Sequence, residues 1–195
     1  MKYYKVLGKD GEPCNGGAGK YFLPTKKKDG SWKAGKWMPK IEGDLVPCEN
    51  GYHLCRPQDL VHWLGEEIYE AEYRGARIDD DNKIVVSQVR LLGKLETWTE
   101  RTAREFACWC VRNTPIGKGK TTWSLLGTES KSAVVVAEKY AAGNATIEEL
   151  AAARAAARAA AWAAAWDAAR DAARDAARDA ARDAQSKKLC EMLGI

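Results

Sequence analysis

The last quarter of the chain is built on a four-residue repeat that leaves few alternatives to a helix. Between residues 150 and 184 the sequence is almost entirely alanine, arginine and aspartate, and the block Ala-Ala-Arg-Asp recurs. Alanine has the highest helix propensity of all residues, and no glycine or proline follows until Gly194. Thr146 and Glu149 have the spacing of a capping box, which marks a helix start. The sequence therefore predicts one very long alanine-rich helix from about Ile147.

The repeat carries both charges and two large rings. Residues 147–195 hold eight basic and eight acidic side chains. Each four-residue step rotates the pattern by about 40° around the helix, so neither an alanine stripe nor an arginine stripe stays on one face, and the pattern is not a coiled-coil heptad. Trp162 and Trp166 lie one turn apart. We expect both rings to be buried, either against other helices of this chain or at an interface with a second copy or a partner.

The remaining sequence has the patterns of a mixed domain. Residues 1–146 contain six of the eight tryptophans and all seven tyrosines, so a core of large side chains belongs there. Alternation of apolar and polar residues predicts strands at 2–7, 51–55, 67–74 and 83–92. Helical spacing or helix-start signals predict helices at 57–65, about 100–113 and 131–142, whereas 25–40, 75–82 and 114–129 have loop composition. We expect an α+β fold, with a small, mostly antiparallel sheet domain at 1–96 and an α-helical region at 97–195.

Positive charge is concentrated near the start of the chain. Residues 1–40 carry ten lysines and three acids, whereas residues 41–146 carry 13 basic and 16 acidic residues. Lysines interleaved with flat rings are typical of surfaces that bind nucleotides or single-stranded nucleic acid, and a basic patch also suits an acidic protein. The same rings could instead be core. The candidate binding residues are Lys26, Lys27, Lys28, Trp32, Lys33, Lys36 and Trp37.

One constellation could carry out acid–base chemistry. His53 lies on a predicted short strand, and Glu70 and Glu72 share one face of the next predicted strand. A histidine and a carboxylate can act as general base and acid only if the fold brings them together. We keep these three residues as the catalytic alternative to a protein without catalysis.

The sequence does not favour a metal or a cofactor. Cys14, Cys48, Cys55, His53 and His62 lack the close Cys-x-x-Cys pair that is typical of structural zinc. The segment Gly117–Thr121 is similar to a phosphate loop, but Thr114 stands where the pattern requires glycine. We therefore expect no metal and no cofactor.

Three segments resemble a family of uncharacterised phage and bacterial proteins, some of which are labelled as immunity proteins. The first is Gly51-Tyr52-His53-Leu54-Cys55, and the second is the pattern Trp-x-x-x-x-Ala-x-x-Phe-Ala-x-x-Cys from Trp98 to Cys110. The third runs from Val136 to Leu150 and leads into the alanine-rich tail. The resemblance covers most of the chain and implies a mobile-element setting, but it supplies no catalytic residues.

These observations lead to a ranked functional hypothesis. No apolar run approaches the roughly 20 residues that span a bilayer, and no signal peptide follows Met1, so we expect a cytoplasmic protein that does not enter a membrane, in the host cytoplasm if it is phage-encoded. The leading hypothesis is a non-enzymatic phage-type accessory protein that binds a host macromolecule or a nucleotide and inhibits a host defence system. The alternatives are a small enzyme acting on a nucleotide or nucleic acid, and a structural protein that forms homo-oligomers through the long helix.

Overall fold

The computed structural model describes residues 1–14, 16–17, 19–117, 119–164 and 175–195. These residues form two compact units, one of residues 1–99 with 189–195 and one of residues 100–188. The strands are β1 (Tyr3–Leu7), β2 (Thr25–Lys26), β3 (Trp32–Lys33), β4 (Tyr52–Leu54), β5 (Glu67–Asp80) and β6 (Lys83–Lys94). The helices are η1 (Lys9–Gly11), η2 (Pro57–His62), α1 (Glu100–Asn113), α2 (Thr122–Leu125), α3 (Thr128–Ala141), α4 (Ile147–Ala164) and α5 (Asp175–Leu193).

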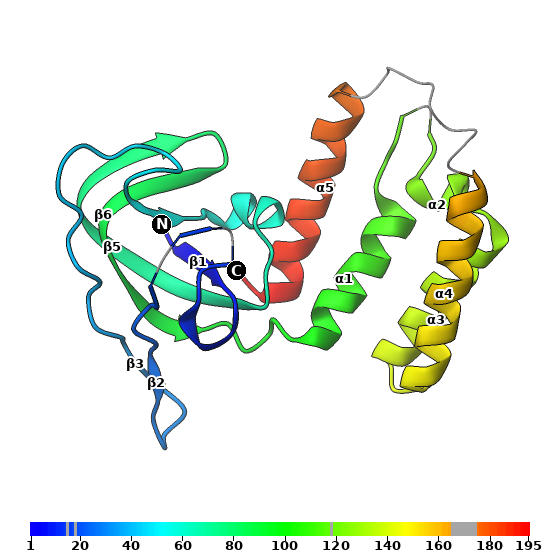
Figure 1. Ribbon diagram of the computed structural model, residues 1–195, viewed down its shortest axis with the longest axis horizontal. Helices are drawn as coiled ribbons and strands as arrows, with labels where there is room; N and C mark the ends of the chain where they lie inside the picture. Colours follow the sequence, from blue (N-terminus) through cyan, green and yellow to red (C-terminus); the bar gives the residue numbers. More distant parts are fainter. Residues whose placement is uncertain (15, 18, 118, 165–174) are drawn as a thin grey trace. The chain divides into compact units, whose positions relative to one another are not determined.

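The first unit is built on a four-stranded antiparallel sheet in the order β1-β5-β6-β4. Its two long strands, β5 and β6, form a curved hairpin (Figure 1). The two outer strands also meet, because the backbone groups of Tyr4 and Cys55 exchange two hydrogen bonds of 2.8 Å. This single bridge connects the ends of the sheet order, so the sheet curls back on itself. The mixed α+β class and the antiparallel sheet agree with the prediction.

The core of the first unit lies on one face of this curled sheet. Alternate residues of each strand point to the same face, and the buried side chains of that face include Leu7, Leu54, Ile84 and Val86. The opposite face is also covered, because Tyr4, Ile68 and Val85 are fully buried. Central strands covered on both faces explain why β6 reads as an almost continuous apolar run.

The expected polar turn at residues 75–82 is wrong. Strand β5 continues to Asp80, and only Asp81 and Asn82 connect it to β6. The pairing of β5 with β6 continues past Gly75, with a bulge between Arg74 and Arg77. Gly75 adopts a φ of +84° in this bulge. A side chain at this position would also approach the Ser87 hydroxyl to 2.3 Å. Gly75 therefore allows a bulge within the strand and does not end it.

The second unit is helical. Helix α3 packs on both α1 and α4, and Arg112 of α1 forms an ion pair with Glu138 of α3. The guanidinium group of Arg112 also lies over the Trp123 ring, 4.0 Å from its centroid. The loop expected at 114–129 instead contains α2 and the start of α3, because short helical turns leave no long periodic pattern in the sequence.

The alanine-rich segment is helical wherever it is described. The predicted capping box is confirmed, since the Glu149 amide donates to Thr146 Oγ1 and the Thr146 amide donates to the Glu149 carboxylate. Helices α4 and α5 cover residues 147–164 and 175–193. Residues 165–174 lie outside the described residues, and so does the expected placement of the Trp162 and Trp166 rings. One very long helix is therefore not shown, and the tryptophan interface stays a prediction.

The end of the chain belongs to the first unit, which the expected division at residue 96 did not anticipate. Thr97 Oγ1 donates to the backbone oxygen of Leu193 at 3.1 Å, and Cys190 Sγ lies 3.5 Å from the backbone oxygen of Pro57 as a hydrogen-bond donor. Leu189 is fully buried and Leu193 is 4% exposed. Residues 189–195 therefore pack as part of the first unit.

We expect Leu189→Ala to lower the free energy of unfolding by about 2–5 kcal/mol, because the substitution removes a fully buried side chain and leaves a cavity. Leu125→Ala is the matched control, since Leu125 is 68% exposed, and it should cost less than about 0.5 kcal/mol. Chemical denaturation followed by circular dichroism measures both. Equal effects of the two substitutions would show that the tail does not contribute to the packing of the sheet domain.

Candidate functional site: a basic hairpin and an adjacent cavity

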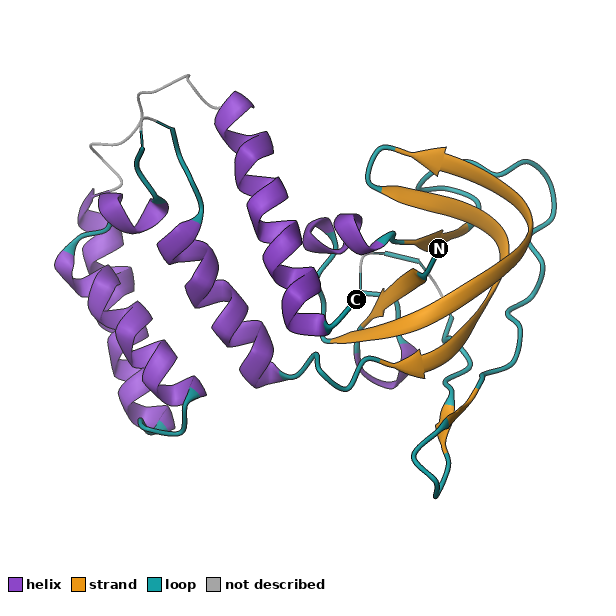
Figure 2. Cartoon of the chain, turned by 180° about the vertical axis from the view of Figure 1, so that it is seen from behind, coloured by secondary structure: helices purple, strands orange, loops and turns teal. Residues whose placement is uncertain are grey.

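The basic segment folds into a small hairpin that projects from the sheet (Figure 2). Strands β2 and β3 pair antiparallel, with Thr25 opposite Lys33 and Lys26 opposite Trp32. Asp29 shapes the turn, because its carboxylate accepts hydrogen bonds from the amide and the hydroxyl of Ser31. These hydrogen bonds lower the pKa of Asp29.

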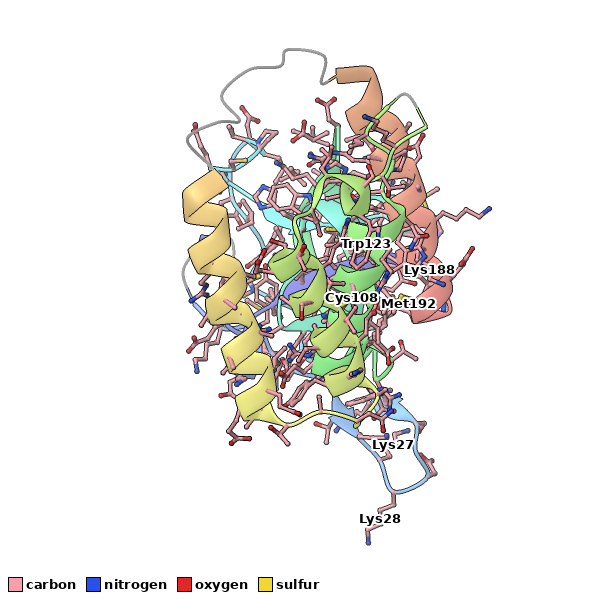
Figure 3. All side chains as sticks on the ribbon, turned by 90° about the vertical axis from the view of Figure 1, so that its right-hand side faces the viewer. Lys27, Lys28, Cys108, Trp123, Lys188 and Met192 are labelled. Atoms are coloured by element: carbon pink, nitrogen blue, oxygen red, sulfur yellow. The ribbon has the colours of Figure 1, made fainter. Side chains whose placement is uncertain are left out.

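The hairpin exposes its lysines. Lys28 projects beyond the tip of the hairpin (Figure 3), and Lys27, Lys33 and Lys36 are exposed as well. Lys26 differs, since its ammonium group pairs with Glu96 and lies 5.8 Å from the centroid of the Trp32 ring. Within the described part of the chain, the other four lysines have no carboxylate partner. The hairpin is therefore a surface of uncompensated positive charge.

The rings of Trp32 and Trp37 are engaged by other residues of the chain. Trp32 covers Gly93 of β6 so closely that a side chain there would come within 2.8 Å of the ring. Two guanidinium groups contact the Trp37 ring, since the Cζ atoms of Arg74 and Arg90 lie 4.4 and 4.8 Å from its centroid. The structure thus brings the predicted lysines together but commits both rings to contacts within the chain. The sequence did not single out Arg74 and Arg90 as partners of Trp37, although strand alternation places both on one face of the sheet.

A cavity of about 600 Å³ lies in the same unit, where β1 and β4 meet. Its walls include Lys5 and Val6 from β1 and Tyr52 and His53 from β4. Residues of segments 13–22 and 38–51 also line it, together with Cys55, Trp63 and Lys83. The strands share only the bridge between Tyr4 and Cys55. The cavity therefore lies beside the single bridge that joins β1 to the end of β4.

The structure separates His53 from the carboxylates with which it was grouped. His53 lines the cavity, whereas Glu70 pairs with Lys2 and Glu72 pairs with Arg90. The reason is the strand order, because β6 lies between β4 and β5. His53 Nε2 instead accepts a hydrogen bond from the Cys48 amide at 3.0 Å. Burial and the nearby ammonium groups of Lys5 and Lys83 lower the pKa of His53, which favours a neutral imidazole.

Two lysines of the cavity have contrasting surroundings. Lys83 is 7% exposed, and its ammonium group contacts Asp80 Oδ2 and Cys48 Sγ, each at 3.3 Å. Burial lowers the pKa of Lys83, but these two contacts outweigh it and raise the pKa overall. Lys5 donates to the backbone oxygen of His53 at 3.1 Å and has no carboxylate partner among the described residues. Burial lowers its pKa to about 8.

In comparisons with known proteins, the chain matches no protein-family model, no curated protein and no solved structure. The resemblance to phage and bacterial proteins therefore stays a prediction. Among the described helices, none combines the length and the apolar character of a membrane span. Nor do three metal-ligating side chains gather anywhere in the part of the chain that is described.

Lys5 gives the folding free energy a pH dependence whose sign follows from its pKa. The unfolded chain keeps a pKa near 10.5, whereas the folded value is about 8. Between these pH values the unfolded state binds more protons, so the contribution of Lys5 to stability rises with pH and is least favourable below pH 8. We expect Lys5→Met to be more stable than the wild type near pH 7, with a difference that shrinks as the pH rises to 10.5.

Chemical denaturation at a series of pH values measures this difference, with Lys2→Met as the exposed control. The subtraction cancels the titratable groups that do not interact with Lys5. A stability difference that does not change with pH would contradict the assignment of a buried, positively charged Lys5.

Proposed function

We propose that the protein is a non-enzymatic binding protein that engages an acidic protein surface through its basic hairpin. The observation that carries the proposal is the group of exposed lysines at positions 27, 28, 33 and 36, which have no carboxylate partner among the described residues. Opposite charges across an interface accelerate encounter and select the partner. In the phage setting that the resemblance implies, the partner class is an acidic component of a host defence system.

Two features favour a protein over a nucleic acid as the partner. Single-stranded nucleic acid binding relies on aromatic rings that stack with bases, and here Trp32 and Trp37 are engaged by neighbouring residues. Binding along a duplex relies on an extended positive surface. The first unit instead has sixteen basic and sixteen acidic residues, so its formal net charge is zero, and the lysines of residues 25–36 are a local excess. A compact patch of this kind matches a patch of opposite sign on a folded protein.

Contacts within the unit also favour binding over catalysis. The histidine and the two glutamates that could have formed an acid–base group are held apart by β6, and both carboxylates are paired with basic side chains. The hairpin exposes the ammonium groups of Lys27, Lys28 and Lys33, which can attract and orient an anionic surface.

We expect the triple substitution of Lys27, Lys28 and Lys33 by glutamine to weaken binding to an acidic polypeptide by about tenfold or more, because several charge contacts are lost together. Fluorescence anisotropy with labelled polyglutamate measures this affinity, which should also fall steeply with added salt. The matched control replaces Lys9, Lys120 and Lys139, which are exposed and lie outside the hairpin, and removes the same charge.

The same measurements with a DNA duplex and a single strand test the class of partner. Affinity for either nucleic acid that exceeds the affinity for polyglutamate at equal salt would overturn the choice of a protein partner. Equal losses in the hairpin variant and the control variant would overturn the choice of the hairpin.

A further inference from the structure

The cavity of the first unit has the size of a small-molecule site. Its volume of about 600 Å³ falls within the range of about 300–1,000 Å³ that is typical of ligand pockets. The cavity is lined within one unit and is distinct from the hairpin, because none of Lys26, Lys27, Lys28 or Lys33 contributes to it. A ligand there would therefore be recognised independently of the acidic partner proposed above.

Basic side chains outnumber acidic ones in the described lining of the cavity. Of the described residues that line it, Lys5, Lys20 and Lys83 are basic and Glu49 alone carries a carboxylate. Lys20 pairs with Glu12 and Lys83 pairs with Asp80, so these two charges are compensated. Lys5 is half-buried at the centre of a strand whose other four residues are buried. A buried charge without an ionic partner is costly in the folded state, and an anionic ligand would compensate it.

Two aromatic rings line the cavity beside Lys5. Tyr21 and Tyr52 meet edge to face with their ring centroids 6.0 Å apart, and the Tyr52 hydroxyl is held by a hydrogen bond to the backbone oxygen of Pro39 at 2.8 Å. The Lys5 ammonium group lies 4.9 Å from the centroid of the Tyr21 ring. The cation and the aromatic wall are therefore adjacent, which is the arrangement that a ring with an attached anionic group requires.

The donors of Lys5 also leave capacity for a ligand. A lysine ammonium group has three N–H donors, and the protein accepts one of them through the His53 backbone oxygen. At neutral pH Lys5 is mostly protonated, since burial lowers its pKa only to about 8. It can thus give charged hydrogen bonds to a phosphate or a carboxylate.

We propose that this cavity binds a small anionic molecule that carries a flat ring, with Lys5 as the counter-ion and Tyr21 and Tyr52 as the wall for the ring. Mononucleotides and aromatic carboxylates share this chemistry. They differ in the anionic group, so separate ligands in one titration series distinguish them.

Isothermal titration calorimetry of the full chain with AMP, GMP, CMP, UMP, benzoate and indole-3-acetate tests the proposal. At least one of these ligands should bind, and adenosine and inorganic phosphate, which each offer half of the recognition, should bind about tenfold more weakly or worse. Binding of the mononucleotides alone assigns a phosphate ligand, and binding of the carboxylates alone assigns a carboxylate. If none of the six binds at millimolar concentration, or if adenosine binds as well as AMP, the proposal is overturned.

Substitutions locate the ligand in the cavity. Lys5→Met should weaken binding by about tenfold or more through the loss of a charged hydrogen bond, while thermal unfolding shows that the variant is folded. Lys2→Met, next to the same strand but outside the cavity lining, should leave binding unchanged, and so should the triple hairpin variant. Retained affinity in folded Lys5→Met would overturn the assignment of the counter-ion.

A second readout does not depend on any substitution. Cys48 lines the cavity and is exposed, so a bound ligand should slow its alkylation by iodoacetamide, followed by mass spectrometry of the peptide that contains it. Cys110, in the second unit, is the internal reference. Unchanged alkylation of Cys48 at a saturating concentration of a ligand that binds by calorimetry would place that ligand elsewhere and overturn the site.

Discussion

The backbone bridge between Tyr4 and Cys55 is the contact on which the first unit depends. Its two hydrogen bonds join β1 to β4, while β1 pairs with β5 on its other edge. Strand β1 is thereby enclosed on both edges, and four of its five residues are buried. Because β4 is only three residues long, the pairing is confined to one bridge, and the sheet closes at one point and opens into the cavity beside it. Closure of the sheet and the presence of the cavity thus have one cause.

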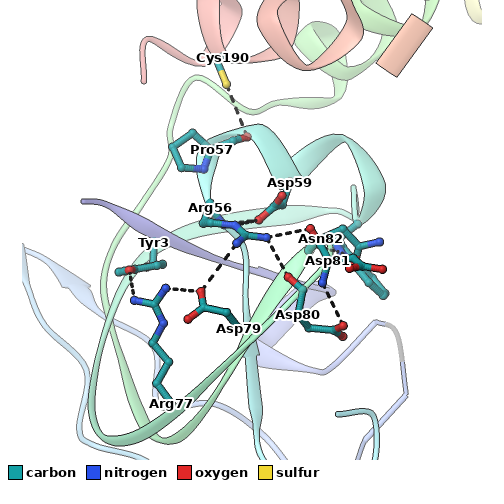
Figure 4. A network of polar contacts seen from close by, with 11 residues as sticks. Tyr3, Arg56, Pro57, Asp59, Arg77, Asp79, Asp80, Asp81, Asn82 and Cys190 are labelled. Atoms are coloured by element: carbon teal, nitrogen blue, oxygen red, sulfur yellow. Dashed lines mark hydrogen bonds and ion pairs between the residues drawn. The ribbon is translucent and has the colours of Figure 1, made fainter. Parts of the chain in front are cut away.

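Charge in this unit is balanced in total but not locally. Arg56 lies at the centre of a polar network in which its guanidinium group pairs with Asp59 and donates to the backbone oxygens of Asp80 and Asp81 (Figure 4). Arg77 pairs with Asp79 and donates to the Tyr3 hydroxyl in the same network. These contacts connect the β5–β6 turn to η2 and to β1. The carboxylates of Asp79 and Asp80 are paired with basic side chains of this unit, Arg77 and Lys83.

The sequence predicted elements with a strong periodic signal and failed where tertiary contacts decide. The long strands, α1, α3 and the Thr146 cap could be read from the pattern, because each buries one face or satisfies one helix end locally. The continuation of β5 through Gly75 could not, since it depends on the β6 ladder. The return of the last residues to the sheet domain depends on contacts with residues 57 and 97, which no local pattern contains.

The candidate site shows the same limit in its chemistry. Sequence proximity placed lysines and tryptophans in a single constellation that would attract an anion and stack on a ring. In the fold, cationic groups of Lys26, Arg74 and Arg90 lie against those tryptophans, so the hairpin offers charge without an open ring. The rings that line the cavity, Tyr21 and Tyr52, lie next to Lys5. Lys5 reads in the sequence as one ordinary lysine in a strand. What distinguishes Lys5 is that it is half-buried and has no ionic partner among the described residues. The burial of a single side chain is set by the closure of the sheet and not by its neighbours in sequence.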